Sequence, residues 1–120
     1  MHDTINKADA VINVTPYSVT YDGNSHTATG TATGVKGEPL AGLDLSGTTH
    51  TNAGDFPNDP WKFTDSTGNY NGANGTVHDI INKADAKVIV TPYTVTYDGN
   101  SHTAAGTATG VKGEPLAGLD

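Results

Sequence analysis

Two long stretches of this sequence are nearly identical and lie 76 residues apart. Residues 5–44 align without a gap to residues 81–120, and 35 of the 40 aligned positions carry the same amino acid. Residues 45–80 occur only once, between the two copies. Self-similarity at a fixed period is the signature of tandem repeats. Whatever fold one unit adopts, it must therefore be a fold that can be joined to copies of itself.

The repeat divides the chain into three expected parts. Residues 1–6 are the end of a preceding repeat or a linker, residues 7–83 form one unit (the full unit), and residues 84–120 form the first half of a second (the half-unit). The dipeptide His-Asp near the start recurs at His78 and Asp79. We therefore expect the sequence to begin, as well as end, inside repeats of a longer array.

The composition argues against several classes of protein. Without cysteine, the chain can form neither disulfides nor thiolate metal sites. The net charge is −7, and the six lysines are scattered with no arginine among them, so we expect no binding to nucleic acid or to anionic membranes. No apolar run approaches the roughly 20 residues that a bilayer-spanning helix needs, so no membrane insertion is expected.

The residue types and their spacing predict an all-β fold. Threonine, which favours strands, occurs 19 times, and the turn formers Asn and Asp occur 10 and 11 times. Six or seven short strands separated by turn signals are typical of a sandwich or a barrel, and we favour a small β-sandwich. The expected strands of the full unit cover residues 10–15, 17–21, 26–34, 43–51, 61–64 and 76–81.

Alternation along these strands predicts which side chains face the core. In the first strand, Ile12 and Val14 stay apolar in both copies, whereas positions 11 and 13 change character. We expect an edge strand that kinks at Pro16 and continues through Tyr17, Val19 and Tyr21, and Asp22-Gly23 should form a tight turn. The side chains expected to be mostly buried are Ile12, Val14, Leu43, Leu45, Trp61, Phe63 and Ile80.

The polar residues do not form a pattern that predicts catalysis. Asp22, Ser25 and His26 supply the residue types of a hydrolytic triad, but neighbours on a strand point to opposite faces. Glu38 and Glu114 occupy equivalent loops of separate units rather than one cleft. We therefore predict no enzyme activity and no catalytic residues.

Candidate binding and crosslinking groups are equally sparse. The five histidines are not spaced for joint metal ligation, and residues 52–59 and 65–74 offer oxygen ligands for calcium without a recognised calcium loop. Lys62 is a weak candidate for an isopeptide crosslink, because it should point outward between Trp61 and Phe63. No metal or cofactor is predicted. Aromatic residues could instead form a carbohydrate-binding face; these are Tyr17, Tyr21, Tyr70 and Trp61.

Several motifs together resemble one family. The opening "VTYDG" with "HTATGTATGV", then "SGTTHTNAG", "GNYN", "GTV" and the closing Ile-x-Lys-Ala are similar to the YDG/MBG group of bacterial immunoglobulin-like repeats. The resemblance spans the whole chain. It implies an immunoglobulin-like β-sandwich repeated in tandem within large, secreted, surface-attached adhesins. In related domains "NAG-x-Y" forms a tyrosine corner; here Phe56 replaces the tyrosine and "PNDP" is inserted before Trp61, so the corner's hydroxyl bond is not expected.

The resemblance and the near-identity of the copies together predict a structural role. We expect a spacer or stalk repeat of an extracellular adhesin or fibre on a bacterial cell surface. The alternative is an adhesion module whose loops bind a glycan or a host protein. The expected partners are neighbouring repeats of the same protein. The half-unit lacks its partner strands, so a homo-oligomer or fibre formed by strand exchange or edge pairing is also expected.

Overall fold

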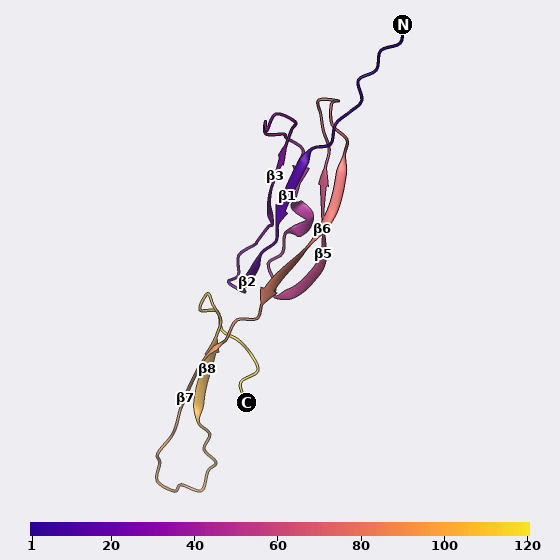
Figure 1. Cartoon of the computed structure of the whole chain (residues 1–120). Coiled ribbons are helices and arrows are strands. Elements are labelled where there is room, and N and C mark those ends of the chain that lie inside the picture. The colour runs from indigo at the N-terminus through magenta and orange to yellow at the C-terminus, as the bar shows by residue number, and fades with distance from the viewer.

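The computed structural model describes all 120 residues and is built from β-strands, as the composition predicts. It is long and narrow, with extents of 105 × 20 × 17 Å (Figure 1). Its only helical element is a short 3-10 turn, and no helix is long and apolar enough to cross a membrane. In chain order the elements are β1 (Val11–Thr15), β2 (Ser18–Thr20), β3 (Thr29–Thr33), β4 (Leu43–Asp44), η1 (Ser46–Thr48), β5 (Gly54–Phe63), β6 (Ala73–Asn82), β7 (Lys87–Thr91) and β8 (Ala105–Thr109).

The full unit contains two sheets. β1 and β3 pair antiparallel in one of them. The other has the order β2-β6-β5-β4, in which β2 runs parallel to β6 and the remaining neighbours are antiparallel. Pro16 interrupts the strand as predicted, but the expected continuation as one kinked edge strand is wrong, because β1 ends before Pro16 and β2 joins the other sheet. Proline cannot donate to a continuing ladder, so the chain changes sheets at this point.

The predicted turn at Asp22-Gly23 is also present. Gly23 has φ +78°, a left-handed conformation that glycine adopts without strain, and the Asp22 carboxylate accepts a hydrogen bond of 2.9 Å from the Asn24 amide. The strands on either side of the turn do not pair with each other, since β2 lies beside β6 and β3 beside β1. The turn thus leads the chain from one sheet to the other.

Side chains from both sheets build the core. Phe63 of β5 is 1% exposed and packs with Ala32 of β3 and with Tyr70. Half-buried apolar side chains, among them Ile12 of β1 and Leu43 of β4, surround these three. Each sheet therefore covers the apolar face of the other.

The predicted core is only partly correct. Of the seven side chains expected to be mostly buried, only Phe63 is; the half-buried six are Ile12, Val14, Leu43, Leu45, Trp61 and Ile80. In β6 the buried positions are Asp79 and Ile81, rather than Ile80. Residues 79 and 81 share one face of the strand. The sequence did not indicate that residues 79 and 81 point inward, because an aspartate occupies one of these positions and alternation predicts apolar side chains on the buried face.

The strand predicted for residues 43–51 is wrong beyond its first two residues. β4 ends at Asp44, and the chain then forms η1. Thr48, which is fully buried, donates a hydrogen bond of 2.7 Å from its hydroxyl to the Leu45 carbonyl and accepts one of 2.9 Å from the Ala28 amide. These bonds favour a turn over an extended strand, as is common for threonine side chains that reach nearby backbone groups.

The inserted "PNDP" segment lies within β5 rather than in a turn. The register between β5 and β6 shifts between Phe56 and Asp59, as expected where an extra residue and a proline interrupt a ladder. Phe56 stacks on His50 with ring centroids 3.6 Å apart and an interplanar angle of 1°. The phenylalanine that replaces the expected tyrosine therefore makes an aromatic contact in place of a hydroxyl bond.

The half-unit repeats one sheet of the full unit without the other. β7 and β8 pair antiparallel in the same register as β1 and β3, with Val90 opposite Gly106 where Val14 lies opposite Gly30. No further strand pairs with them (Figure 1). Every residue of β7 is exposed as a result.

Candidate functional site at the junction of the two units

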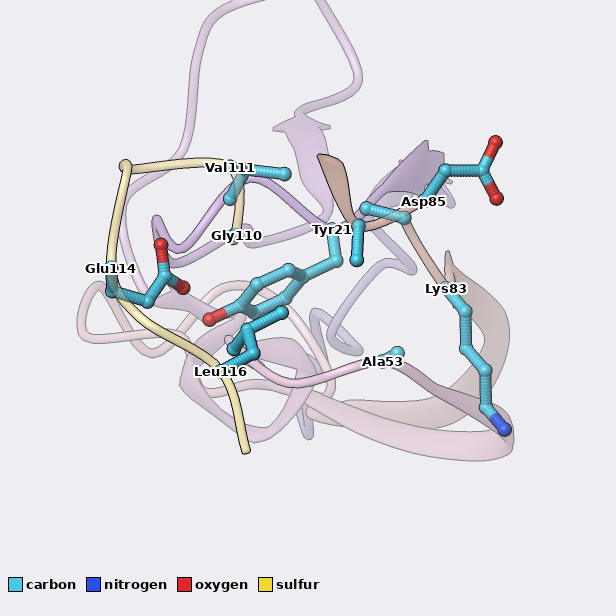
Figure 2. A pocket seen from close by; sticks show the side chains of 10 residues that line it. Tyr21, Ala53, Lys83, Asp85, Gly110, Val111, Glu114 and Leu116 are labelled. Atoms are coloured by element: carbon cyan, nitrogen blue, oxygen red, sulfur yellow. The ribbon is translucent and has the colours of Figure 1, made fainter. Parts of the chain in front are cut away.

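A hollow lies where the full unit meets the half-unit. It has a volume of about 300 Å³ and is lined mainly by apolar side chains. Figure 2 shows the Tyr21 ring of the full unit reaching toward the Glu114 and Leu116 side chains of the half-unit. Val111 and Ala84 also line the hollow. The two units thus meet through side chains as well as through the connecting chain.

Two hydrogen bonds fix the residues on the two sides of this junction. The Tyr21 amide donates a hydrogen bond of 2.8 Å to the carbonyl of Asn82, the last residue of β6. On the other side, Lys112 donates from Nζ to the Gly23 carbonyl at 3.1 Å. A side chain at position 23 would collide with the Lys112 side chain, so the glycine permits this close approach as well as the turn.

A closely related environment surrounds Tyr70 in the full unit. The Tyr70 hydroxyl donates to Glu38 Oε2 at 2.8 Å and accepts from the Val35 amide at 3.0 Å. The hydrogen bond from Tyr70 is the main cause that lowers the pKa of the Glu38 carboxyl. Ala8 and Leu40 pack around the same core. The same four positions of the half-unit line the junction hollow. They are Ala84, Val111, Glu114 and Leu116, which are equivalent in the repeat to Ala8, Val35, Glu38 and Leu40.

A second group of polar residues is buried inside the full unit and was not predicted. Asp79 is fully buried, and its Oδ1 accepts a hydrogen bond of 3.0 Å from the Tyr17 amide, whereas its Oδ2 has no partner. Burial, reinforced by the neighbouring Asp59, raises the pKa of the Asp79 carboxyl. Burial also raises the pKa of Tyr17 to about 12, and the Tyr17 hydroxyl donates to the Thr48 carbonyl at 2.6 Å. These groups do not line any of the hollows described here.

The triad candidates are not brought together. His26 Nε2 lies 3.0 Å from Asp22 Oδ1, but Ser25 is exposed and makes no hydrogen bond to either. The same histidine–aspartate pair recurs at His102 and Asp98, also at 3.0 Å. A pair that forms identically in an isolated hairpin is a local feature of the turn.

The candidate metal ligands are engaged in local hydrogen bonds. Asp65, in the 65–74 segment, accepts hydrogen bonds from the Thr67 hydroxyl and from the backbone amides of residues 68, 69 and 70. Burial opposes its ionisation, but these bonds outweigh that effect and lower the pKa of Asp65 to about 2. No group of three or more His, Asp or Glu side chains is arranged to hold a metal ion.

The aromatic residues proposed as a binding face lie in different places. Tyr70 is buried in the core, and Tyr17 and Trp61 are half-buried within the full unit. Tyr21 lies at the junction. The crosslink candidate Lys62 is exposed, as its outward position predicts. The four aromatic side chains therefore do not form one surface.

Comparison with known proteins identifies no relative. No family model matches the chain, and neither the curated proteins nor the solved structures contain a match. The junction residues were missed by sequence reasoning, but one signal could have found them. Lys36 and Lys112 occupy equivalent positions of the repeat, and only Lys112 follows a full unit in this chain. A contact between Lys112 and that preceding unit could therefore have been expected.

Proposed function

We propose that the chain is a spacer repeat of an extracellular adhesin or fibre on a bacterial surface, in which each unit is a small immunoglobulin-like β-sandwich. The all-β composition, the two sheets that share a core and the family-like motifs support this proposal. The near-identity of the two copies supports it too, because every unit of a spacer has the same task of adding length.

One observation carries the proposal. The chain enters the full unit at one end and leaves it at the other, and β6 is followed by only a short connection to β7 (Figure 1). Successive units are therefore laid out along the long axis of the molecule, whose other two extents are 20 and 17 Å. An added repeat would increase the length and leave the thickness unchanged.

The junction supports the same layout at the level of side chains. Tyr21 is half-buried there, whereas its equivalent in the half-unit, Tyr97, is 92% exposed. Val111 is 45% exposed at the junction, and its equivalent Val35 at the far end of the full unit is 72% exposed. Each end of the chain thus displays one half of the junction that joins the two units. At the start of the full unit Glu38 already accepts a hydrogen bond from Tyr70, so a preceding copy would meet the exposed Val35 there.

The test is small-angle X-ray scattering on arrays of one to four full units. The maximum dimension should increase by a constant amount per unit while the cross-section stays constant. A matched array that carries Lys112→Ala at every junction should bend more and show a smaller maximum dimension. An array that collapses to a compact particle would contradict the spacer role. Saturable binding of the full unit to a glycan array or to host cells would favour the alternative role as an adhesion module.

A further inference from the structure

We propose that the full unit cleaves its own backbone at the peptide bond between Asp59 and Pro60, with the Asp59 side chain as the nucleophile and Asp79 as the acid. The substrate is the Asp–Pro bond of the chain itself. Each unit would react once, which is self-processing rather than enzyme turnover. The proposal goes beyond the spacer role and does not rest on it, because it follows from the interior of a single unit.

The bond in question has an unusual chemistry. Asp59-Pro60 is the only Asp-Pro dipeptide of the chain, and it lies in the inserted "PNDP" segment of β5. An aspartate carboxylate can attack its own backbone carbonyl carbon, because the product is a five-membered cyclic anhydride. The prolyl nitrogen is a tertiary amide nitrogen and is more basic than that of an ordinary peptide bond. A nearby acid can therefore protonate it as it leaves.

The nucleophile points into the unit. Asp59 is buried and lies opposite Val77, so it shares the inward face of the β5–β6 ladder with Val77 and with Asp79, two residues further along β6. Both Asp59 oxygens lie 2.9 Å from His50 Nε2. With a proton on Nε2, the imidazole stabilises the charged form of this carboxyl. That charged form is the one that attacks a carbonyl carbon.

Asp79 is suited to the opposite role. It is fully buried, its Oδ1 accepts a hydrogen bond from the Tyr17 amide, and its Oδ2 has no partner. Burial and the neighbouring Asp59 raise the pKa of the Asp79 carboxyl, so its neutral form is favoured. A buried polar atom without a partner calls for an explanation, and a proton that can be donated supplies one. Two adjacent carboxyls that favour opposite protonation states are what acid–base chemistry needs.

Two further titratable groups face this pair of carboxyls. Burial raises the pKa of Tyr17 to about 12, and the Tyr17 hydroxyl donates to the Thr48 carbonyl, so Tyr17 stays neutral while the carboxyls titrate. His50 bonds to Asp59, and its charge opposes the raised pKa of Asp79 without outweighing burial. Asp79 is therefore the group of this cluster whose proton is available to the Pro60 nitrogen.

The reaction balances without any added reagent except water. An ionised Asp59 Oδ atom forms a bond to the backbone carbonyl carbon of Asp59. The bond from this carbon to the Pro60 nitrogen breaks, and the nitrogen keeps the electron pair and takes the proton from Asp79. The products are a cyclic anhydride at Asp59, a secondary amine at Pro60 and an ionised Asp79, and water then opens the anhydride to two carboxyl groups. Pro60 is exposed and lines a hollow of about 340 Å³, so water can reach this side of the bond.

The cleaved unit would stay assembled. β6 pairs with Gly54–Phe56 on one side of the bond and with Pro60–Phe63 on the other. The fragments 1–59 and 60–120 would therefore remain paired with each other in native buffer. Cleavage has to be measured after denaturation.

The experiment incubates the 1–120 chain from pH 4 to pH 8 and follows the masses of the denatured products over days. We expect two fragments, 1–59 and 60–120, that form faster at low pH because Asp79 must hold its proton. Circular dichroism identifies the pH values at which the chain is folded. At these values the folded chain should cleave at least about tenfold faster than the same chain in concentrated guanidinium chloride, where the acid is no longer held beside the bond.

Three variants separate the roles of the carboxyls. Asp59→Asn removes the nucleophile and should abolish cleavage over the same period. Asp79→Asn keeps the shape of the side chain but has no acidic proton, so it should slow cleavage at least about tenfold while the protein stays folded. Asp55→Asn is the matched control, because Asp55 lies on the same strand, is exposed and precedes Phe56 instead of a proline. It should cleave as the wild type does.

The proposal is overturned if the folded chain stays intact at every pH. It is also overturned if the folded chain cleaves no faster than the unfolded one, which would be the ordinary acid lability of an Asp–Pro bond. Cleavage of Asp79→Asn at the wild-type rate would overturn it too, because the proton would then come from another group. Each of these results would leave the spacer role standing, since the length of an array does not depend on this reaction.

Discussion

His50 Nε2 lies 2.9 Å from both carboxylate oxygens of Asp59. Asp59 is 7% exposed and lies close enough to the fully buried Asp79 to contribute to the raised pKa of the Asp79 carboxyl. Two carboxyl groups thus share an interior, and the His50 ring is within hydrogen-bonding distance of the Asp59 carboxylate. The polar interior depends on that histidine.

His50→Ala should destabilise the full unit by about 1–3 kcal/mol, because it leaves the buried Asp59 carboxylate without its donor. The measurement is the free energy of unfolding by urea at pH 7. His78→Ala is the matched control, since His78 pairs with Asp55 and both side chains are more than half exposed. The control should change stability by less than about 0.5 kcal/mol. Equal effects of the two variants would show that burial of the pair does not matter.

Asp79→Asn should stabilise the protein at pH 7 by about 1 kcal/mol, because an amide donates from the atom that has no partner in the wild type. The pKa of Asp79 is raised above 3.8, so the folded state holds this proton more tightly than the unfolded chain does. The wild type therefore loses stability relative to Asp79→Asn as pH rises from about 3.8 through the folded-state pKa. Urea unfolding of both proteins from pH 3 to pH 7 measures this difference. A difference that does not grow with pH would contradict the assignment.

Leu43→Ala should cost about 2 kcal/mol, because Leu43 packs against the core of the full unit. Leu119→Ala, at the equivalent position of the half-unit, should change stability by less than about 0.5 kcal/mol. The two variants make the same chemical change in the same local sequence, so they compare covered and open faces directly. If Leu119→Ala were the more harmful, the half-unit would have displaced residues 8–44 from β5 and β6.

Gly75→Ala should destabilise the full unit by about 1–2 kcal/mol and shift the emission of Trp61 to the red. Gly75 lies opposite Trp61 in the β5–β6 ladder, and an added Cβ would lie 2.7 Å from the indole ring. The ring would have to move toward solvent. Trp61 is the only tryptophan, so fluorescence reports on this site alone. Gly72→Ala is the control, because its Cβ would meet only the Phe63 carbonyl oxygen at an ordinary 3.4 Å.

The sequence predicted well what depends on local pattern. The all-β class, the inward direction of Ile12 and Val14 and the break at Pro16 follow from alternation and from the chemistry of proline, and the structure contains each of them. It predicted poorly what depends on partners distant in the sequence. Asp79 is buried because the Tyr17 amide, 62 residues away, donates to it, and no local pattern contains that information. The junction contact between Lys112 and Gly23 spans 89 residues and was missed for the same reason.

The parallel pairing of β2 with β6 has a mechanical consequence. β2 follows β1 early in the full unit and pairs with the end of β6, the strand by which the chain leaves it. A force that pulls the two ends apart would slide these strands past each other along their length. The hydrogen bonds that join them, from the Ile80 amide to the Tyr17 carbonyl and from the Tyr21 amide to the Asn82 carbonyl, would then be loaded together in shear instead of opening one after another. Tension along the molecule would meet its greatest resistance at this short pair of strands.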